Sequence, residues 1–221
     1  MTCQTTGKGG LAEASRPSQP PILVMDGLRK RYAEELFAPL SLVLHPGEGL
    51  GVFGYNGSGK TTLLDMLSGL LKPTAGSFTR EGACGYCMQH TGFQDSLTFK
   101  ENLLLEAYLC GLKGTEAQQR THEVAARCDL LSFWKKRYRK GSSGMQGRLR
   151  IAAALLMRPR LLLLDEAFNF LDERSVEHMR HVLLAEKERG AALVMVSHNR
   201  DDFTGLCERV LYLPEARIEA L

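Results

Sequence analysis

The sequence lacks a hydrophobic run long enough to cross a membrane. A spanning helix needs about 20 consecutive apolar residues, and the richest stretch, residues 151–164, is interrupted by Arg158, Pro159 and Arg160. The N-terminal residues contain no apolar segment of the kind that secretory signals carry. These absences predict a soluble, cytoplasmic protein.

Neither the cysteines nor the charged residues form a pattern that indicates disulfides, a zinc site or a nucleic-acid partner. The six cysteines have no disulfide-framework spacing, and the single Cys84-x-x-Cys87 pair lacks the second ligand pair that a structural zinc site needs. We therefore expect free thiols in a reducing compartment. Lys and Arg number 28 against 25 Asp and Glu, a net charge of +3. That excess is too small to indicate a nucleic-acid partner, and none is expected.

The 221 residues are 44% hydrophobic and 24% charged, which is typical of one globular domain. Residues 1–20 are polar and rich in Gly, Ser, Thr and Pro, and are expected to form a mobile tail before a single domain at 21–221. Strands are expected at 22–25, 40–44, 49–53, 161–164, 191–196 and 209–213, helices at 61–71, 98–112, 115–131, 147–157 and 175–189, and a short hairpin at 77–88. Apolar runs that alternate with helices predict an α/β fold with a parallel sheet covered on both faces.

Residues 54–61, Gly-Tyr-Asn-Gly-Ser-Gly-Lys-Thr, match the phosphate-loop pattern G-x-x-x-x-G-K-[ST]. An apolar run precedes the motif and a helical pattern follows it, as the motif requires. Glycines allow backbone N–H groups to converge on an anion, and the helix presents its positive end. We expect nucleotide phosphates to be bound by Gly54, Asn56, Gly57, Ser58, Gly59, Lys60, Thr61 and Thr62.

Two carboxylates end a second apolar run, Leu-Leu-Leu-Leu-Asp165-Glu166. Asp165 is expected to hold Mg²⁺, and Glu166 to polarise the water that attacks the γ-phosphate. The alternative is that Asp165 only caps the following turn. Its place in the same predicted sheet as the strand before Lys60 favours the metal role.

Residues 141–148, Gly-Ser-Ser-Gly-Met-Gln-Gly-Arg, resemble the signature motif of ATP-binding-cassette (ABC) proteins, and a helix and the Asp-Glu strand follow in the family's order. Further resemblances occur in sequence order across residues 22–213. They are Tyr32 at the adenine-stacking position, Gln89 at the Q-loop glutamine, residues 95–103 before the helical subdomain, residues 169–172 at the D-loop and His198 at the switch histidine.

The resemblance implies a P-loop NTPase fold with a RecA-like mixed sheet core, a small antiparallel β part and an inserted helical subdomain at about 96–157. It implies hydrolysis of ATP with Mg²⁺. The implied roles are catalysis by Glu166, His198 and Gln89, metal binding by Thr61, Gln89 and Asp165, and nucleotide contacts by Tyr32, Asp165, Ser142 and Gly144.

An ABC ATPase without membrane spans implies a separate integral membrane permease, with this chain attached to the inner face of the cell membrane through it. The permease is expected to contact the region of Gln89 and residues 98–112. The short segment between Gly76 and Gln89 and the Gly-Met pair of the signature resemble those of compact exporter cassettes. The alternative is a non-transport ABC ATPase that acts on ribosomes or DNA, although the chain shows neither the second cassette nor the long coiled coil of those groups.

The signature departs from the family pattern at three positions. Ser143 stands where the first glycine is usual, Met145 where glutamine is usual, and Gly141 where a bulky residue is usual. Serine adds a Cβ and restricts the backbone. ABC ATPases close as head-to-tail dimers in which each signature faces the partner's phosphate loop. We therefore hypothesise a second ABC ATPase subunit as partner, in a heterodimer whose catalytic half comes from this chain.

Overall fold

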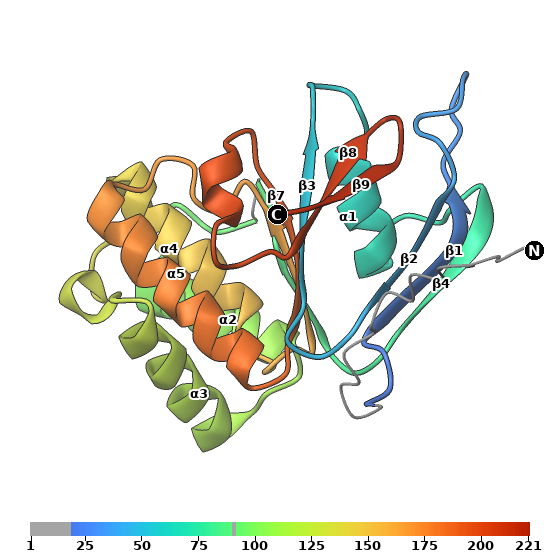
Figure 1. The fold of residues 1–221 in the computed structure, drawn as a ribbon. Helices are drawn as coiled ribbons and strands as arrows, with labels where there is room; N and C mark the ends of the chain where they lie inside the picture. Colours follow the sequence, from blue (N-terminus) through green and yellow to red (C-terminus); the bar gives the residue numbers. More distant parts are fainter. Residues whose placement is uncertain (1–18, 90–91) are drawn as a thin grey trace, which may run out of the picture.

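The computed structural model describes residues 19–89 and 92–221, so the expected tail at 1–20 lies almost wholly outside the described residues. Two sheets are present, of six and three strands (Figure 1). The strands are β1 (Leu23–Arg29), β2 (Leu40–Leu44), β3 (Gly49–Gly54), β4 (Ala75–Arg80), β5 (Cys84–Cys87), β6 (Leu161–Asp165), β7 (Ala192–Val196), β8 (Arg209–Leu213) and β9 (Arg217–Ala220). The α-helices are α1 (Lys60–Ser68), α2 (Phe99–Leu109), α3 (Gly114–Arg127), α4 (Ser143–Ala154) and α5 (Glu173–Glu188).

The six-stranded sheet has the order β5-β6-β7-β3-β8-β9. Every neighbouring pair is parallel except β8 with β9. All five residues of β6 and of β7 are buried, because both faces of the sheet are covered. In β6, Leu161 and Leu163 face one hydrophobic cluster and Leu162 and Leu164 face the other. The predicted parallel α/β fold is therefore confirmed.

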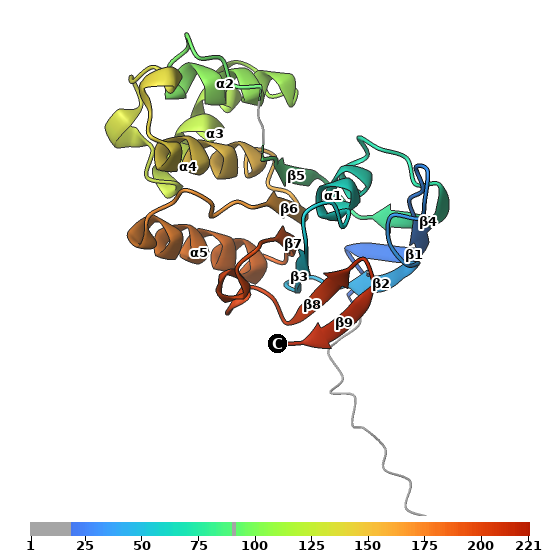
Figure 2. The same cartoon turned by 90° about the horizontal axis from the view of Figure 1, so that it is seen from above.

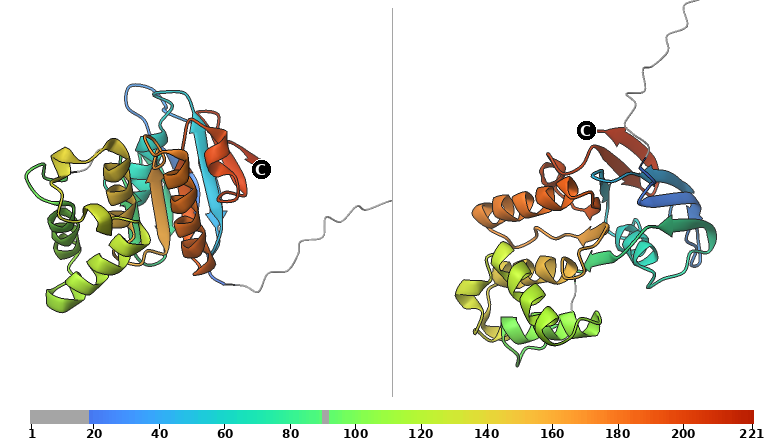
Figure 3. Two further views of the ribbon diagram at one scale, coloured as in Figure 1. Left: turned by 90° about the vertical axis from the view of Figure 1, so that its left-hand side faces the viewer. Right: turned by 90° about the horizontal axis from the view of Figure 1, so that it is seen from below.

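Helix α1 lies between the two sheets, where its leucines join the cluster that also holds β1 and β2 (Figure 1). Helices α4 and α5 cover the opposite face of the large sheet. Helices α2, α3 and α4 pack together at its β5 end, away from the small sheet (Figures 2 and 3). The mixed sheet core, the small antiparallel sheet and the group of helices in the middle of the chain are all present.

The hairpin expected at residues 77–88 is wrong. Strand β4 pairs antiparallel with β1 in the small sheet, whereas β5 pairs parallel with β6 in the large one. The two strands separate because their partners lie elsewhere in the chain. The Glu81 N–H donates to Ile22 O at 2.9 Å, and Ala83 O accepts from the Arg160 N–H at 2.9 Å. The turn residues between the strands therefore bridge two sheets instead of closing one.

The start of α4 and the presence of β9 also differ from expectation. Helix α4 begins at Ser143, four residues before the expected start, because Ser142 caps it. Strand β9 was not predicted, since its Arg-Ile-Glu-Ala sequence is short and mostly exposed. Within the part of the chain that the structure describes, no helix combines the length and apolarity that crossing a bilayer requires.

Candidate nucleotide-binding and hydrolysis site

The phosphate loop connects β3 to α1 at the carboxyl end of the large sheet (Figure 1). Gly57 has φ +88° and Gly59 has φ +96°, a left-handed backbone that favours glycine. A Cβ on Gly59 would lie 2.8 Å from side-chain atoms of Leu36 and Phe37. Gly59 is thus required both by its left-handed backbone and by the lack of room for a Cβ, and α1 begins directly after it at Lys60.

Lys60 places its ammonium inside this loop. Its Nζ donates to Gly54 O at 2.8 Å and to Tyr55 O at 3.1 Å. Burial lowers the pKa of Lys60, and the carboxylates of Glu166 and Asp165 oppose that shift. The lysine is therefore a desolvated cation held beside two acids, which suits it to an anionic ligand.

The other residues predicted to bind phosphates differ in their exposure. Asn56 and Gly57 are exposed at the tip, and Thr62 is half-buried on α1. The Ser58 hydroxyl is buried and makes no hydrogen bond in the described structure. An orphaned hydroxyl in the loop is consistent with a polar ligand that binds there.

Thr61 and Asp165 are brought together from the two motifs. Thr61 Oγ1 donates to Asp165 Oδ2 at 2.8 Å. Asp165 is 2% exposed. Burial raises its pKa, with a smaller rise from nearby Glu166, while the hydrogen bond from Thr61 lowers it. A hydroxyl and a carboxylate at this separation are oxygen donors of the kind that Mg²⁺ selects.

Glu166 is the meeting point of the predicted catalytic residues. It is 9% exposed and has φ +49°, a strained backbone for a residue with a side chain. One carboxylate oxygen is in contact with His198 Nε2, and the other accepts from Asn169 Nδ2 and, at 3.4 Å, from Gln89 Nε2. The carboxylate is thus oriented from three loops that follow three strands.

The signature residues are not part of this cluster. Ser142 Oγ caps α4 by accepting from the Met145 N–H at 3.3 Å. A Cβ on Gly144 would lie 3.3 Å from Phe170 O. Among the described residues, no hydrogen bond joins Ser142 or Gly144 to the phosphate loop of the same chain.

Tyr32 also stands apart. Its side chain is 63% exposed, with Lys30 Nζ 5.2 Å from the ring centroid. The loop that carries it is nevertheless anchored beside the phosphate loop, because Leu36 and Phe37 pack against Gly59. An exposed aromatic face on an anchored loop is suitable for stacking on a base.

Sequence reasoning missed Arg150. This residue of α4 is 8% exposed, and its Nη1 donates to Gln89 O at 2.8 Å. It fixes the backbone of Gln89 from the helix that Ser142 caps. An arginine within an apolar helical pattern is a weak signal, and no local motif marks it. By contrast, Arg148, which the signature pattern includes, bonds Asp129 Oδ2 at 2.7 Å, away from the site.

The fold and the site define a phosphate-loop ATPase domain. The family described as ABC transporter matches residues 37–169. An uncharacterized ABC transporter ATP-binding protein of Bacillus subtilis, YybJ, is 36% identical over 190 residues, which cover 81% of this chain and 86% of YybJ. The O-antigen export system ATP-binding protein RfbB of Klebsiella pneumoniae is 32% identical over 180 residues, which cover 81% of this chain and 73% of RfbB.

A solved structure of the ATP-binding cassette MJ0796, dimeric and in a post-hydrolysis state bound to ADP and Pi, superposes with a TM-score of 0.81. It is 25% identical and covers 90% of this chain and 98% of that one. The chain belongs to the ABC transporter family, and it is an ATP-binding ATPase domain of that family.

Proposed function

We propose that this chain hydrolyses MgATP in order to drive export through a separate membrane permease. The observation that carries the proposal is the convergence of Lys60, Asp165 and Glu166 at one edge of the sheet, with Thr61 bonded to Asp165. Export is supported by relatives named for O-antigen export and for teichoic acids export. Attachment to the inner face of the membrane then comes through the permease.

The residues present fit a magnesium ion. Thr61 Oγ1 and Asp165 would hold it, and the side-chain carbonyl of Gln89 would complete the set, since all are oxygen donors. Bound Mg²⁺ supplies charge neutralisation at the β- and γ-phosphates. Lys60 and the loop N–H groups from Gly57 to Thr62 bind and orient the phosphates, and Tyr32 stacks on adenine.

Glu166 is the proposed general base. It accepts the proton of the water that attacks the γ-phosphorus, and ADP leaves with the electron pair of the broken P–O bond. Asn169 and Gln89 hold one carboxylate oxygen, and the other, which contacts His198, is proposed to accept the proton when His198 turns to the γ-phosphate. His198 donates a hydrogen bond to the γ-phosphoryl oxygens as their charge changes. The strained φ of Glu166 is the cost of that orientation.

A second cassette is needed because Ser142 and Gly144 lie outside the cluster of their own chain. We propose that they face the nucleotide of a second cassette in a dimer. Ser143 is the first residue of α4, and its backbone is not among the positive-φ residues. The serine therefore fits at the start of α4 without a strained backbone, and the proposed partner remains a second ABC ATPase subunit, as a homodimer or a heterodimer.

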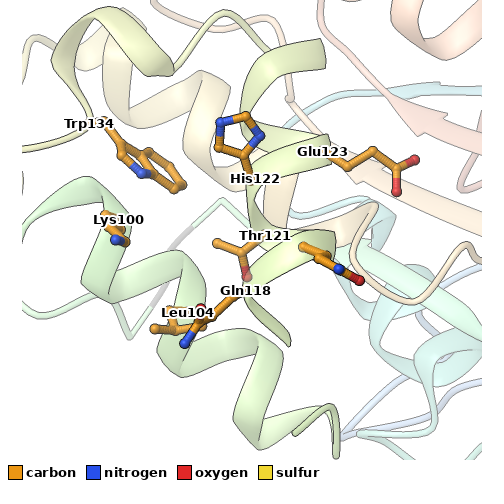
Figure 4. Close-up of a pocket in the computed structure, with 8 residues that line it drawn as sticks. Lys100, Leu104, Gln118, Thr121, His122, Glu123 and Trp134 are labelled. Atoms are coloured by element: carbon orange, nitrogen blue, oxygen red, sulfur yellow. The ribbon is translucent and has the colours of Figure 1, made fainter. Parts of the chain in front are cut away.

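The permease docking site is proposed to be a cavity of about 440 Å³ between α2 and α3. Lys100 and Leu104 of α2 face Gln118 and Thr121 of α3 across it, with Trp134 at one side (Figure 4). Thr121 is 2% exposed, and its hydroxyl makes no hydrogen bond within the described structure. Because that oxygen is itself out of reach of solvent, a permease helix would contact the cavity through Leu104 and Trp134.

ATP hydrolysis by the purified chain and its Glu166→Gln variant tests the catalytic assignment. The variant keeps the carboxylate's shape and loses its basicity, so we expect kcat to fall at least about 100-fold while a fluorescent ATP analogue still binds. Equal activity in the variant would remove Glu166 as the base.

Co-purification with the polytopic membrane protein encoded beside this chain tests the docking site. Leu104→Asp places a charge in the cavity and is expected to abolish capture. The matched control is Leu70→Asp, since Leu70 is 68% exposed just after α1. Capture by neither variant, or by both, would contradict this site. Sedimentation of the wild-type chain with ribosomes would favour the non-transport alternative.

A further inference from the structure

Gly141 lies directly before Ser142, the cap of α4, and a side chain at position 141 is excluded for an unusual reason. Its backbone has φ −73° and ψ 148°, an extended conformation that any residue adopts. A Cβ built there would nevertheless lie 2.5 Å from Phe99 Cζ and 2.9 Å from Phe99 Cε2. The same Cβ would lie 3.1 Å from Tyr138 O, so the position is restricted first by the Phe99 ring and second by that carbonyl, and not by its own φ and ψ.

The Phe99 ring cannot easily move away. Phe99 is 0% exposed, and its ring packs against Phe133 at 5.0 Å and Tyr138 at 5.6 Å between centroids. Phe99 is also the first residue of α2, whose start is fixed by a capping box between Thr98 and Glu101. A ring that packs against two other aromatic rings, on a residue at a fixed helix start, acts as a rigid wall against Gly141.

Backbone hydrogen bonds tie the start of α2 to the segment that leads into the signature. The N–H groups of Phe99 and Lys100 donate to Lys136 O and Trp134 O at 3.0 and 3.1 Å. In return, the Tyr138 N–H donates to Leu97 O at 2.8 Å. Residues 134–138 and the first turn of α2 therefore move as one body.

The same body is joined to the signature helix and to the segment after the Q-loop glutamine. Tyr138 O accepts from the Gly141 N–H at 2.8 Å and from Gln146 Nε2 at 3.2 Å. On the other side, Asn102 of α2 exchanges hydrogen bonds of 2.7 and 3.0 Å with the Gln94 backbone. Phe99 is thus at the centre of a continuous set of contacts from residue 94 to residue 146.

We propose that Phe99 is a positioning residue for the signature: its ring, seated against Gly141, sets where the Ser142 cap and the first turn of α4 stand relative to the nucleotide of the partner cassette. Displacement of α2 by a docked permease is passed to Ser142 through this contact. The inference rests on the proposed function, because it assigns Phe99 to the signature half of a dimeric ATPase.

The test changes the size of the side chain on each side of the contact between Phe99 and Gly141, in the full chain. Phe99→Ala removes the wall and Gly141→Leu forces a side chain into it, so each is expected to lower kcat by about 10- to 100-fold, as small displacements of reacting groups do. Binding of a fluorescent ATP analogue stays within about twofold, because the phosphate loop is not touched. The double variant refills the space from the other side and is expected to recover kcat to within about threefold of wild type.

The matched control is Val182→Ala, which removes volume from the same hydrophobic cluster at a residue of α5 that is outside the aromatic contacts of Phe99. It is expected to lower the melting temperature while keeping kcat within about twofold, and Gly141→Ala gives a milder version of the clash if Gly141→Leu does not fold. An active wild type whose double variant is no better than the worse single variant would overturn this inference alone, as would a loss of kcat in Val182→Ala. A wild-type chain without ATPase activity would overturn the proposed function as well.

Discussion

Thr61 Oγ1 donates a hydrogen bond of 2.8 Å to Asp165 Oδ2 across 104 positions of sequence. The bond joins the first turn of α1 to the end of β6, two strands away from β3 in the large sheet. It brings together two of the three groups proposed to hold Mg²⁺. The proposed metal site thus combines both motifs and depends on the sheet that aligns them.

Two substitutions of Thr61 distinguish the contribution of its hydroxyl from that of its branched side chain. Thr61→Val removes the oxygen and keeps the branched side chain, so the Mg²⁺ concentration for half-maximal ATPase activity should rise about 10-fold. Thr61→Ser keeps the oxygen and should remain within about twofold of wild type. Activity measured over a magnesium titration at fixed ATP checks both, and equal behaviour of the two variants would exclude Thr61 as a ligand.

Asn169 is expected to act through Glu166. Asn169→Ala removes a hydrogen bond to a charged group, so kcat should fall about 10-fold while KM for ATP changes little. The control is Asn199→Ala, because Asn199 accepts from the Asp201 N–H and does not touch Glu166. Steady-state kinetics of both variants gives the answer. A change in KM alone would assign Asn169 to nucleotide binding.

Asp165 should reduce stability at neutral pH. Burial raises its pKa in the folded state, so the folded chain binds more protons than the unfolded chain between the two pKa values, and stability falls as the pH rises through that window. Asp165→Asn removes this cost while it removes the proposed metal ligand. We therefore expect a higher urea midpoint at pH 7.5 in the variant.

The stability difference should shrink as the pH falls through the folded-state pKa of Asp165. The exposed carboxyl of Asp26 on β1 provides the control, and Asp26→Asn is expected to leave the midpoint unchanged. A lower midpoint in Asp165→Asn at pH 7.5 would mean that Lys60 and Thr61 stabilise the carboxylate more than burial costs.

The cysteines should differ in how fast their thiols are alkylated. Burial raises the pKa values of Cys87, Cys128 and Cys207 to about 12, so only about one thiol in ten thousand is ionised at pH 8. Cys110 is an exposed free thiol. Iodoacetamide should therefore label Cys110 at least about 100-fold faster than these three, as peptide mass mapping can follow. Rapid labelling of Cys87 in folded protein would contradict the packing at β5.

Local patterns were sufficient for the elements of the site. Glycine spacing marked the phosphate loop, and four leucines before Asp165 and Glu166 marked a strand end, because loop conformation and strand burial depend on nearby residues. The order of motifs identified the family, which the comparisons confirm. The roles of the individual residues remain proposals for the experiments above.

Strand pairing was not accessible in the same way. Residues 77–88 were predicted to form a hairpin, and nothing within them shows that β4 pairs with β1 and β5 with β6. The choice of partner depends on which hydrophobic cluster each strand completes. That is a property of distant residues, which a local pattern cannot contain.

The sequence by itself determined that the chain binds a nucleotide phosphate, is an α/β domain and belongs to one family, because those properties follow from short motifs and hydrophobic periodicity. Only the tertiary structure decided which groups contact one another. In it, Arg150 donates to Gln89, Asn169 and His198 contact Glu166, and the Phe99 ring lies against Gly141. Each of these contacts joins residues from different elements, so its geometry exists only once the sheet and helices have packed.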